Sequence, residues 1–166
     1  MSLRDRLIGL GGGGVVLTTA LFLGPVEAPV LHPYDDIGGV KTWCYGETLG
    51  TPKARYTAQE CEASLLAATQ RHWDGIKDDV PSDAPESVKA GMLSVAYNVG
   101  VKGWRHPLFT RPLSVGDWRG ACEAIRAPWK GKYGVAKGFK ATVGGKPSKG
   151  LENRRAKEYA LCVRDL

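Results

Sequence analysis

The chain has 166 residues, of which 43% are hydrophobic and 24% are charged, and its net charge is +6. This length suits one catalytic unit with a proper core, and the composition excludes a chain that is disordered throughout. The charge is uneven, because residues 126–166 contain 11 Lys or Arg and 3 Asp or Glu. Their local charge of +8, against −2 for residues 1–125, suits an acidic polymer such as nucleic acid or the bacterial wall. A solvated basic surface is the alternative interpretation.

The first predicted element is an uncharged N-terminal segment from Leu7 to Val26, about as long as a bilayer core is thick. Arg4 and Arg6 precede it, which predicts a cytoplasmic N-terminus and export of the rest of the chain. Five glycines, Gly9 and Gly11 to Gly14, weaken its hydrophobicity, so we expect marginal residence in the membrane. An uncleaved signal anchor is the favoured interpretation. A cleaved signal peptide and a buried soluble helix are the alternatives.

A small antiparallel sheet is predicted next. Residues 34–45 alternate turn-forming residues with β-branched and aromatic ones, which predicts a hairpin with Gly38 and Gly39 in its turn. We expect a third short strand near residues 53–56. Thr57 and Glu60 then form a T-x-x-E capping box, which predicts the start of a helix whose apolar face extends to Val80.

The rest of the chain is predicted to be mainly helical. Cap residues and apolar spacing predict three further helices: one that starts at Ser82 or Asp83 and ends at Gly100, one from Asp117 to Arg126, and one over residues 150–163. We expect the first of them to be the central buried helix and residues 127–149 to form a Gly- and Lys-rich loop. A small sheet followed by a bundle of helices is an α+β pattern, with a ligand cleft expected between sheet and bundle.

The chain contains four cysteines, Cys44, Cys61, Cys122 and Cys162. They include no C-x-x-C pair, and no histidine stands at zinc-finger spacing, so structural zinc is not expected. Three disulfide pairings are possible in an oxidising compartment. We favour Cys44 with Cys61, which are close in sequence, and Cys122 with Cys162, which would join two docked helices. Buried free thiols in a cytosolic protein are the alternative.

A candidate catalytic pair follows directly after the uncharged segment. Cleavage of a glycosidic bond usually takes two carboxyl groups, one to protonate the leaving oxygen and one to activate water or attack the sugar. Glu27 and Asp36 are the candidates for this pair, and the hydroxyl of Thr42 could hold a water. The bare pattern E-x8-D-x5-T is weakly specific, because acids and threonines are common.

Longer motifs add what this spacing lacks. The stretch from Glu27 to Thr48 resembles the catalytic region of phage lysozymes of glycoside hydrolase family 24, in which E, Y-x-D, G-x-x-T and G-x-T recur at these intervals. The likeness extends to S-V-A-Y-N-V-G at 94–100, G-A-C at 120–122 and G-L-x-x-R-R-x-x-E at 150–158. All four cysteines stand where the membrane-arrested endolysin branch of that family has them.

This resemblance implies a lysozyme-like fold that hydrolyses the β-1,4 bond between N-acetylmuramic acid and N-acetylglucosamine, with no cofactor and no metal. By its match, Glu27 is the general acid, Asp36 positions or activates the water, and Thr42 assists with that water. Family members are regarded as inverting, which the residues alone do not decide. Asp35 adjoins Asp36, but strand alternation sends neighbours to opposite faces, so only one of them should line the cleft.

Five further residues are candidates for roles at the site. In the family an arginine from the region of Arg154 and Arg155 pairs with the catalytic glutamate, which would lower the pKa of that acid. A surface ion pair along the helix is the alternative for at least one of the two arginines. Tyr97 and Asn98 are candidates for binding an N-acetyl group, although Asn98 could merely end its helix. Glu47 replaces the histidine of the family's G-H-T and is either a third acid or, as we favour, a solvated turn residue.

The histidines and tryptophans are expected to be mainly structural. His32, His72 and His106 are scattered without ligand spacing and should be surface or packing residues. Tryptophans can stack on sugars, but most of the five should lie in the core: Trp43, Trp73, Trp104, Trp118 and Trp129.

Together these features predict a monomeric endolysin with a signal-arrest-release segment at residues 1–26 and a catalytic domain at residues 27–166. While residues 7–26 span the inner membrane, Glu27 would lie at the lipid surface, apart from Asp36, and the exported enzyme would be inactive. Release would deliver the active enzyme to the host periplasm and its peptidoglycan. A non-catalytic wall-binding module and a lytic transglycosylase are the alternatives. A nucleic-acid partner is not expected, because it would not explain the export segment.

Overall fold

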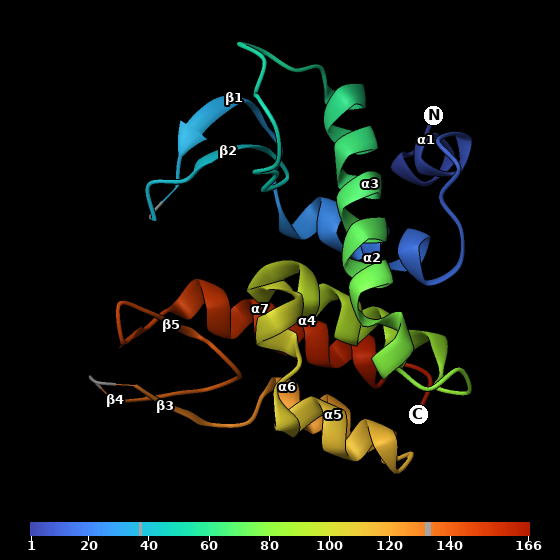
Figure 1. The fold of residues 1–166 in the computed structure, drawn as a ribbon, viewed down its shortest axis with the longest axis vertical. Coiled ribbons are helices and arrows are strands. Elements are labelled where there is room, and N and C mark those ends of the chain that lie inside the picture. The colour runs from blue at the N-terminus through green and yellow to red at the C-terminus, as the bar shows by residue number, and fades with distance from the viewer. Residues whose placement is uncertain (37, 132–133) are drawn as a thin grey trace. The chain divides into compact units, whose positions relative to one another are not determined.

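The computed structural model divides into two compact units, residues 1–71 and residues 72–166. It describes residues 1–36, 38–131 and 134–166, with the backbone alone at residues 129–131 and 134–136. These units are mainly helical and contain short pairs of antiparallel strands (Figure 1). The predicted α+β class is therefore confirmed.

The uncharged N-terminal segment forms two helices instead of one, α1 (Leu3–Gly9) and α2 (Gly14–Val26). Gly11 (φ 89°) and Gly14 (φ 49°) adopt left-handed backbone conformations that side chains oppose, which is why the helix breaks there. In this conformation the segment is packed, since Leu7, Ala20 and Leu23 are fully buried. Among the residues described, no helix has both the length and the apolar character needed to cross a membrane.

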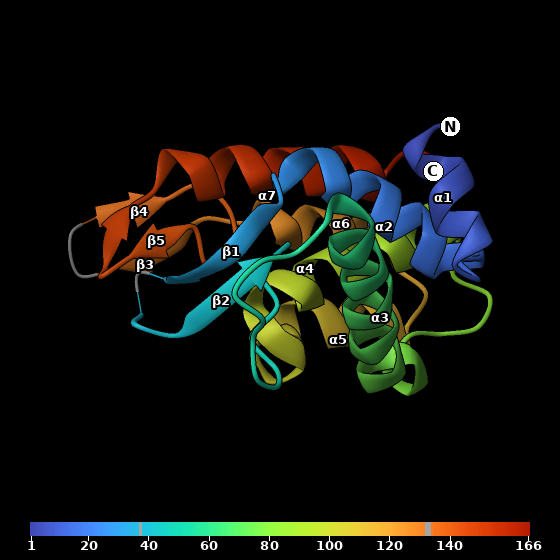
Figure 2. The same cartoon turned by 90° about the horizontal axis from the view of Figure 1, so that it is seen from above.

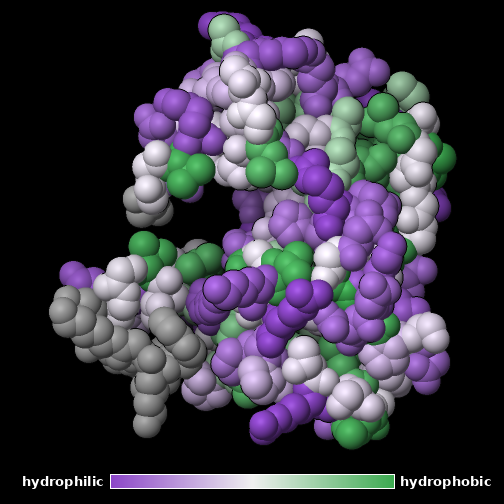
Figure 3. Space-filling model, in the orientation of Figure 1, coloured by the Kyte–Doolittle hydropathy of each residue, from purple (hydrophilic) through white to green (hydrophobic). Residues whose placement is uncertain are grey.

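Part of this segment still presents apolar surface. Ile8 and Leu10 are 47% and 40% exposed, and hydrophobic residues gather over α1 in the space-filling view (Figure 3). Packing of α1 therefore buries Leu7 and leaves the apolar side chains of Ile8 and Leu10 partly exposed.

The predicted hairpin is confirmed, with strands β1 (Val30–Asp35) and β2 (Lys41–Cys44) lying antiparallel (Figure 2). Tyr34 lies opposite Thr42, and the turn contains both predicted glycines. The third strand expected near residues 53–56 is wrong, because these residues form no strand. Among the described residues, the backbone there makes one hydrogen bond to the hairpin, from the Tyr56 N–H to the Leu31 oxygen at 2.9 Å, and one bond does not make a ladder.

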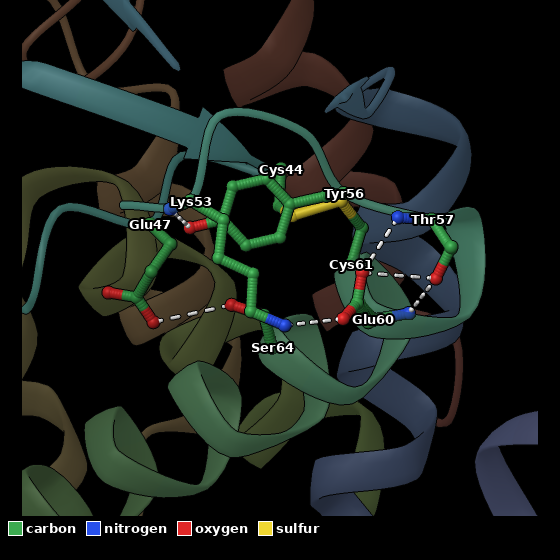
Figure 4. Close-up of a disulfide and its surroundings, with 8 residues drawn as sticks. All are labelled: Cys44, Glu47, Lys53, Tyr56, Thr57, Glu60, Cys61 and Ser64. Carbon is green, nitrogen blue, oxygen red and sulfur yellow. Dashed lines mark hydrogen bonds and ion pairs between the residues drawn. A yellow bond between two sulfur atoms is a disulfide. The ribbon is translucent and has the colours of Figure 1, made fainter. Parts of the chain in front are cut away.

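The predicted capping box opens helix α3 (Ala58–Ile76), which begins in the first unit and ends in the second. The Glu60 N–H donates to Thr57 Oγ1 at 3.2 Å, and the Thr57 N–H donates to Glu60 Oε2 at 2.9 Å (Figure 4). A 3₁₀ turn, η1 (Lys77–Asp79), follows α3 and leads to the buried Val80. The helix is thus shorter than the apolar pattern that continues to Val80.

Four helices make up most of the second unit. They are α4 (Glu86–Trp104), α5 (Pro107–Ser114), α6 (Trp118–Ile125) and α7 (Lys149–Cys162). The expected buried helix is α4, which contacts both α6 and α7. Its predicted start at Ser82 or Asp83 is wrong, because residues 81–84 form a turn closed by a 3.1 Å bond from the Ala84 N–H to the Pro81 oxygen. Gly100 (φ 76°) breaks α4 as expected, yet the chain resumes a helical path to Trp104.

The loop expected at residues 127–149 is wrong in part, since it contains two short hairpins. These are β3 (Trp129–Gly131) with β4 (Gly134–Ala136), and β5 (Thr142–Val143) with β6 (Lys146–Pro147). Phe139, which lies between the hairpins, is 2% exposed and packs edge-on against Phe109 at 4.8 Å between ring centroids. A buried aromatic therefore anchors a segment whose Gly and Lys content indicated a solvated loop.

Two disulfides join Cys44 to Cys61 and Cys122 to Cys162, as predicted. The first links β2 to α3 and is drawn in Figure 4. The second links α6 to α7. Loop closure over 17 and 40 residues stabilises the folded state by about 3 and about 4 kcal/mol in the chain-entropy model.

Candidate active site

Glu27 ends helix α2. It is the C-terminal cap residue, and its N–H donates to the Leu23 oxygen at 2.8 Å. Pro25, inside the last turn, has no N–H to donate to the Leu21 oxygen, which weakens this turn, and the chain leaves the helix at Glu27 and enters β1 three residues later. Local sequence therefore fixes the candidate acid at a half-buried helix end, immediately before the hairpin.

The last turn of α2 is in turn supported by α1. A Cβ atom added to Gly24 would lie 2.8 Å from a methyl of Leu3, so the two helices are in close contact three residues before Glu27. On its other side α1 is held by Arg6, which donates to both carboxylate oxygens of Glu62 on α3 at 2.8 and 2.7 Å. The Glu62 side chain is 5% exposed. Sequence analysis did not single out this pair, because its members lie 56 residues apart.

Asp36 closes the hairpin turn. Its Oδ1 accepts the N–H groups of Gly38 and Val40, both at 2.8 Å, and its own N–H donates to the Val40 oxygen at 3.0 Å. Both of these bonds, the ones seen among the described residues, use Oδ1, and Asp36 lies at an exposed position where Oδ2 can meet water. Asp35 has a different role, because it is the last residue of β1 and forms an exposed ion pair with Lys41 at 2.8 Å.

Thr42 lies on β2 and is 4% exposed. Its hydroxyl donates to the backbone oxygen of Val40 at 2.9 Å. The N–H of the same Val40 donates to Asp36 Oδ1. Since the hydroxyl proton is committed, Thr42 is left with its oxygen lone pairs, and it can hold a water only as an acceptor.

Glu47 is more than the solvated turn residue that we favoured. Its side chain is 11% exposed and forms an ion pair with Arg71 of α3 at 2.6 Å. It also accepts the N–H groups of Thr48 and Leu49 at 2.9 Å. Figure 4 shows its further bond, from the Ser64 hydroxyl at 3.4 Å. Burial raises the pKa of Glu47, but the Leu49 N–H, Arg71 and the Thr48 N–H together bring it below its ordinary value. The carboxylate therefore fastens the end of the hairpin to α3.

In the second unit, Arg154 and Arg155 both bind Glu158 on α7. Arg154 Nε donates to Glu158 Oε1 at 3.0 Å, and Arg155 Nη1 donates to Oε2 at 2.6 Å. The three side chains are 7%, 1% and 0% exposed, so a surface ion pair is wrong for both arginines. The Ser94 hydroxyl of α4 also donates to Glu158, at 2.9 Å. Pairing of either arginine with the catalytic glutamate stays a prediction.

Asn98 and Tyr97 lie near the end of the first part of α4. Asn98 Oδ1 accepts a hydrogen bond from Arg155 Nη2, so this side chain does more than end a helix. The Tyr97 ring lies 5.1 Å from the ring of His72. Binding of an N-acetyl group by Tyr97 and Asn98 stays a prediction, in which Asn98 would act through its amide N–H donors.

The remaining histidines and tryptophans are accounted for by their surroundings. His106 caps α5 by accepting the Leu108 N–H at 3.2 Å, and His32 is exposed on β1. Trp43 and Trp104 are buried in the core, whereas Trp73 and Trp118 are half-buried. The side chain of Trp129 lies outside the described residues. Within the described part of the chain, no cluster of His, Cys, Asp or Glu is suited to a metal ion.

Comparison with known proteins identifies the class, a lysozyme-type hydrolase. A model of the phage lysozyme family matches residues 25–158, and the chain belongs to this family, whose substrate is peptidoglycan. A SAR-endolysin of Enterobacteria phage P21 is 34% identical over 93% of this chain and 90% of its own length. A SAR-endolysin of Bacteriophage PS119 is 32% identical over 98% of this chain and 95% of its own. The active form of the P1 phage endolysin Lyz shares the fold, with a TM-score of 0.76 at 22% identity over 99% of this chain and 94% of that one.

Proposed function

We propose that the protein is an endolysin that hydrolyses the β-1,4 bond between N-acetylmuramic acid and N-acetylglucosamine, with Glu27 as the general acid. The observation that carries this proposal is the placement of Glu27 and Asp36. One stands at the end of α2 and the other in the β1–β2 turn, both in positions fixed by backbone hydrogen bonds. A pair of carboxyl groups on a rigid scaffold is what acid-assisted hydrolysis of a glycosidic bond requires.

In this mechanism the Glu27 carboxyl donates a proton to the glycosidic oxygen as the bond breaks. Asp36 Oδ2, to which no described residue donates a backbone hydrogen bond, orients the attacking water and accepts its proton. Thr42, whose hydroxyl proton is directed to Val40, accepts the second hydrogen of that water through its oxygen. Attack by water on the face opposite the leaving group gives inversion at the anomeric carbon.

We further propose that the enzyme is exported with residues 7–26 in the inner membrane and becomes active in the periplasm on release. The names of the relatives and the composition of the segment support this proposal. α2 has 13 residues, about 20 Å of helix, whereas a bilayer core is about 30 Å thick. Spanning therefore requires α1 and α2 to fuse through the glycines. The packed form requires Gly11 and Gly14 to adopt left-handed conformations. The glycines that allow the packed form therefore weaken the membrane-spanning helix.

The test of catalysis is lysis of outer-membrane-permeabilised Gram-negative cells, followed as a fall in turbidity. We expect Glu27→Gln to reduce the rate by about 10²-fold or more, the usual contribution of general acid catalysis. Asp36→Asn should also be strongly impaired, whereas Asp35→Asn, a matched control one residue away, should stay within about twofold of the wild type because the ion pair of Asp35 with Lys41 is exposed. Unimpaired lysis by Glu27→Gln would refute the role of this residue.

Analysis of the released fragments by mass spectrometry separates the alternatives. Hydrolysis gives reducing ends that carry the elements of water, whereas a lytic transglycosylase gives anhydro ends and a wall-binding module gives no fragments. We expect reducing ends alone.

The test of release is membrane fractionation of two double variants with equal gains in hydrophobicity. Gly11→Ala with Gly14→Ala adds two methyl groups at positions where the packed form needs positive φ. Gly9→Ala with Gly13→Ala adds two at positions with ordinary φ and open space. We expect the first pair to remain in the membrane fraction and the second to be released more readily. Equal retention would show that hydrophobicity alone governs release, and lysis by protein still held in energised membranes would refute inactivity of the tethered form.

A further inference from the structure

The ion pair between Arg6 of α1 and Glu62 of α3 fixes the orientation of α1. Arg6 Nε and Nη2 donate to the two oxygens of Glu62 at 2.8 and 2.7 Å, and Nη1 donates to the Met1 oxygen at 2.7 Å. All three guanidinium nitrogens are therefore engaged in one orientation. Arginine presents its donors in a rigid planar fork that lysine lacks, so this geometry is specific to the residue type.

Glu62 is the more deeply buried partner. Its side chain is 5% exposed, whereas the Arg6 side chain is 35% exposed. Burial and the neighbouring charge of Glu62 raise the pKa of the Tyr45 phenol, so this ring offers no positive charge in place of Arg6. A buried carboxylate is strongly destabilising when its cation leaves. Undocking of α1 is therefore costly, and the ion pair holds this helix against α3.

A docked α1 supports α2 in turn. The two helices are in contact, as Figure 2 shows, and Leu7 of α1 is fully buried. Leu3 lies against Gly24, where an added Cβ atom would come within 2.8 Å of a Leu3 methyl. Gly24 is in the last turn of α2, three residues before Glu27. Displacement of α1 therefore removes packing from the turn that ends at the proposed general acid.

The last turn of α2 depends on this support, because Pro25 weakens its hydrogen bonding. The Glu27 N–H still donates to the Leu23 oxygen at 2.8 Å, which ties the acid to this turn. General acid catalysis depends on the position of the donor, and a misplacement of about 1 Å can lower the rate by about 10²-fold. Movement of the turn should therefore slow the chemical step.

The sequence positions of the two partners connect the ion pair to release. Arg6 directly precedes the uncharged segment, residues 7–26, and Glu62 lies in the part of the chain that is exported in the proposed function. With that segment across the membrane, the two side chains would be on opposite sides of a bilayer core about 30 Å thick. The ion pair is thus a contact of the released form.

We propose that Arg6 is a positioning residue for catalysis, because its ion pair with Glu62 docks α1, and the docked α1 holds the end of α2 from which Glu27 reaches the glycosidic oxygen. This inference rests on the proposed function, in which Glu27 is the acid. Arg6 acts through α1 and α2 and takes no part in the reaction itself. The N-terminal segment is then a working part of the released enzyme.

The test is steady-state hydrolysis of solubilised, un-cross-linked peptidoglycan by the purified full chain, well below the melting temperature of every variant. We expect Arg6→Gln to lower kcat about tenfold and to change KM by less than about twofold, because the acid is displaced while substrate binding is unaffected. Arg4→Gln is the charge-matched control on the same helix. Arg4 is exposed, so this variant should stay within about twofold of the wild type in both constants.

Two further variants separate positioning from a general loss of stability. Arg6→Gln combined with Glu62→Gln removes the unpaired buried carboxylate and should restore kcat to within about threefold of the wild type. Ile125→Val removes a buried methyl group from the second unit and lowers the melting temperature without changing α1. Its kcat should equal that of the wild type.

Leu3→Ala tests the route from α1 to Glu27. It removes the side chain that lies against Gly24 and leaves the ion pair of Arg6 in place. We expect a lower kcat in this variant, and the losses from Leu3→Ala and Arg6→Gln should not add, because both act through the same contact. Additive losses would show that Arg6 does not act through this contact, which would overturn the proposed route.

Three other results would overturn the inference. They are a wild-type kcat in Arg6→Gln, an equal loss in Arg4→Gln, and an equal loss in Ile125→Val, which would assign the effect to stability. Glu27→Gln in the same assay separates this inference from the proposed function. If Glu27→Gln is inactive while Arg6→Gln has the wild-type kcat, this inference alone fails, whereas an active Glu27→Gln overturns the proposed function.

Discussion

Each of the two units buries a carboxylate that arginine satisfies, and they differ in where the arginines come from. Glu158 binds Arg154 and Arg155, which lie four and three residues before it on the same helix. Glu62 binds Arg6, which lies 56 residues away on α1. The partners of Glu158 are therefore present as soon as α7 forms, whereas the partner of Glu62 is present only while α1 is packed. The first cluster stabilises a permanent part of the fold, and the second pair reports the position of the N-terminal segment.

The largest effect is expected at the local cluster. Glu158→Gln leaves two buried guanidinium groups without a counter-charge and should lower the free energy of unfolding by about 3–5 kcal/mol. Ser94→Ala removes only one neutral donor to the same carboxylate and should cost about 1 kcal/mol. Urea unfolding followed by tryptophan fluorescence measures both. Equal losses in the two variants would show that the ion pairs do not hold this cluster together.

At the remote pair, the two single variants should differ from each other. Arg6→Gln leaves the buried carboxylate of Glu62 without a cation, whereas Glu62→Gln leaves Arg6, which is 35% exposed and can reach water. We therefore expect several-fold faster trypsin cleavage after Arg4 in Arg6→Gln than in Glu62→Gln. The double variant should resemble Glu62→Gln. If the two single variants were cleaved at equal rates, the pair would not be what docks α1.

A smaller, pH-dependent effect is expected at Glu47, which joins the hairpin to α3. Its pKa is depressed in the folded state, so its contribution is complete above the unfolded value of about 4.5 and is lost as the pH falls through the lower folded value. Glu47→Gln should lower the free energy of unfolding by about 1–2 kcal/mol at pH 7, and the difference should shrink below pH 4.5. Thermal unfolding at pH 7, 5 and 3 tests this, with the exposed Asp83→Asn as the control. If the difference grew as the pH fell, the ionised carboxylate of Glu47 would not be the stabilising form.

The smallest effect is expected at the exposed pair Asp35–Lys41, whose side chains are 63% and 53% exposed. Lys41→Gln should change the free energy of unfolding by no more than about 0.5 kcal/mol. The difference in melting temperature between the wild type and Lys41→Gln should stay small at every salt concentration. A loss of 2 kcal/mol or more would mean that the hairpin depends on this ion pair rather than on the Asp36 turn.

Elements with local signals could be predicted from the sequence. The Thr57 capping box, the Asp117 cap of α6 and the hairpin turn with its two glycines depend on residues within four positions of one another. The start of α4 depended on a choice among neighbouring cap candidates, and the turn at residues 81–84 decided it. The sequence of strands β3 to β6 shows no alternation of apolar and polar residues that would have predicted them. The contact that anchors this segment joins Phe139 to Phe109, which is far away in the sequence.

The same distinction applies to the candidate site. The motif residues Glu27, Asp36 and Thr42 were found by spacing and resemblance, and the structure adds how their backbone neighbours hold them. What could not be predicted was the set of remote partners. Glu47 pairs with a residue 24 positions away, and Asn98 binds an arginine 57 positions away. Such pairs leave no periodic signal, since only the packing of helices brings them together.

The order of the disulfides along the chain has a consequence for maturation. Cys44 pairs with Cys61 and Cys122 with Cys162, so the two covalent loops follow one another without overlap, each within one unit. An oxidase that joins cysteines in the order in which they emerge from a translocation channel would form both native bonds directly. The thiols of the second loop cannot compete for the first if that bond closes before Cys122 emerges. Maturation of this chain should therefore need a dithiol oxidase and should be largely indifferent to a disulfide isomerase.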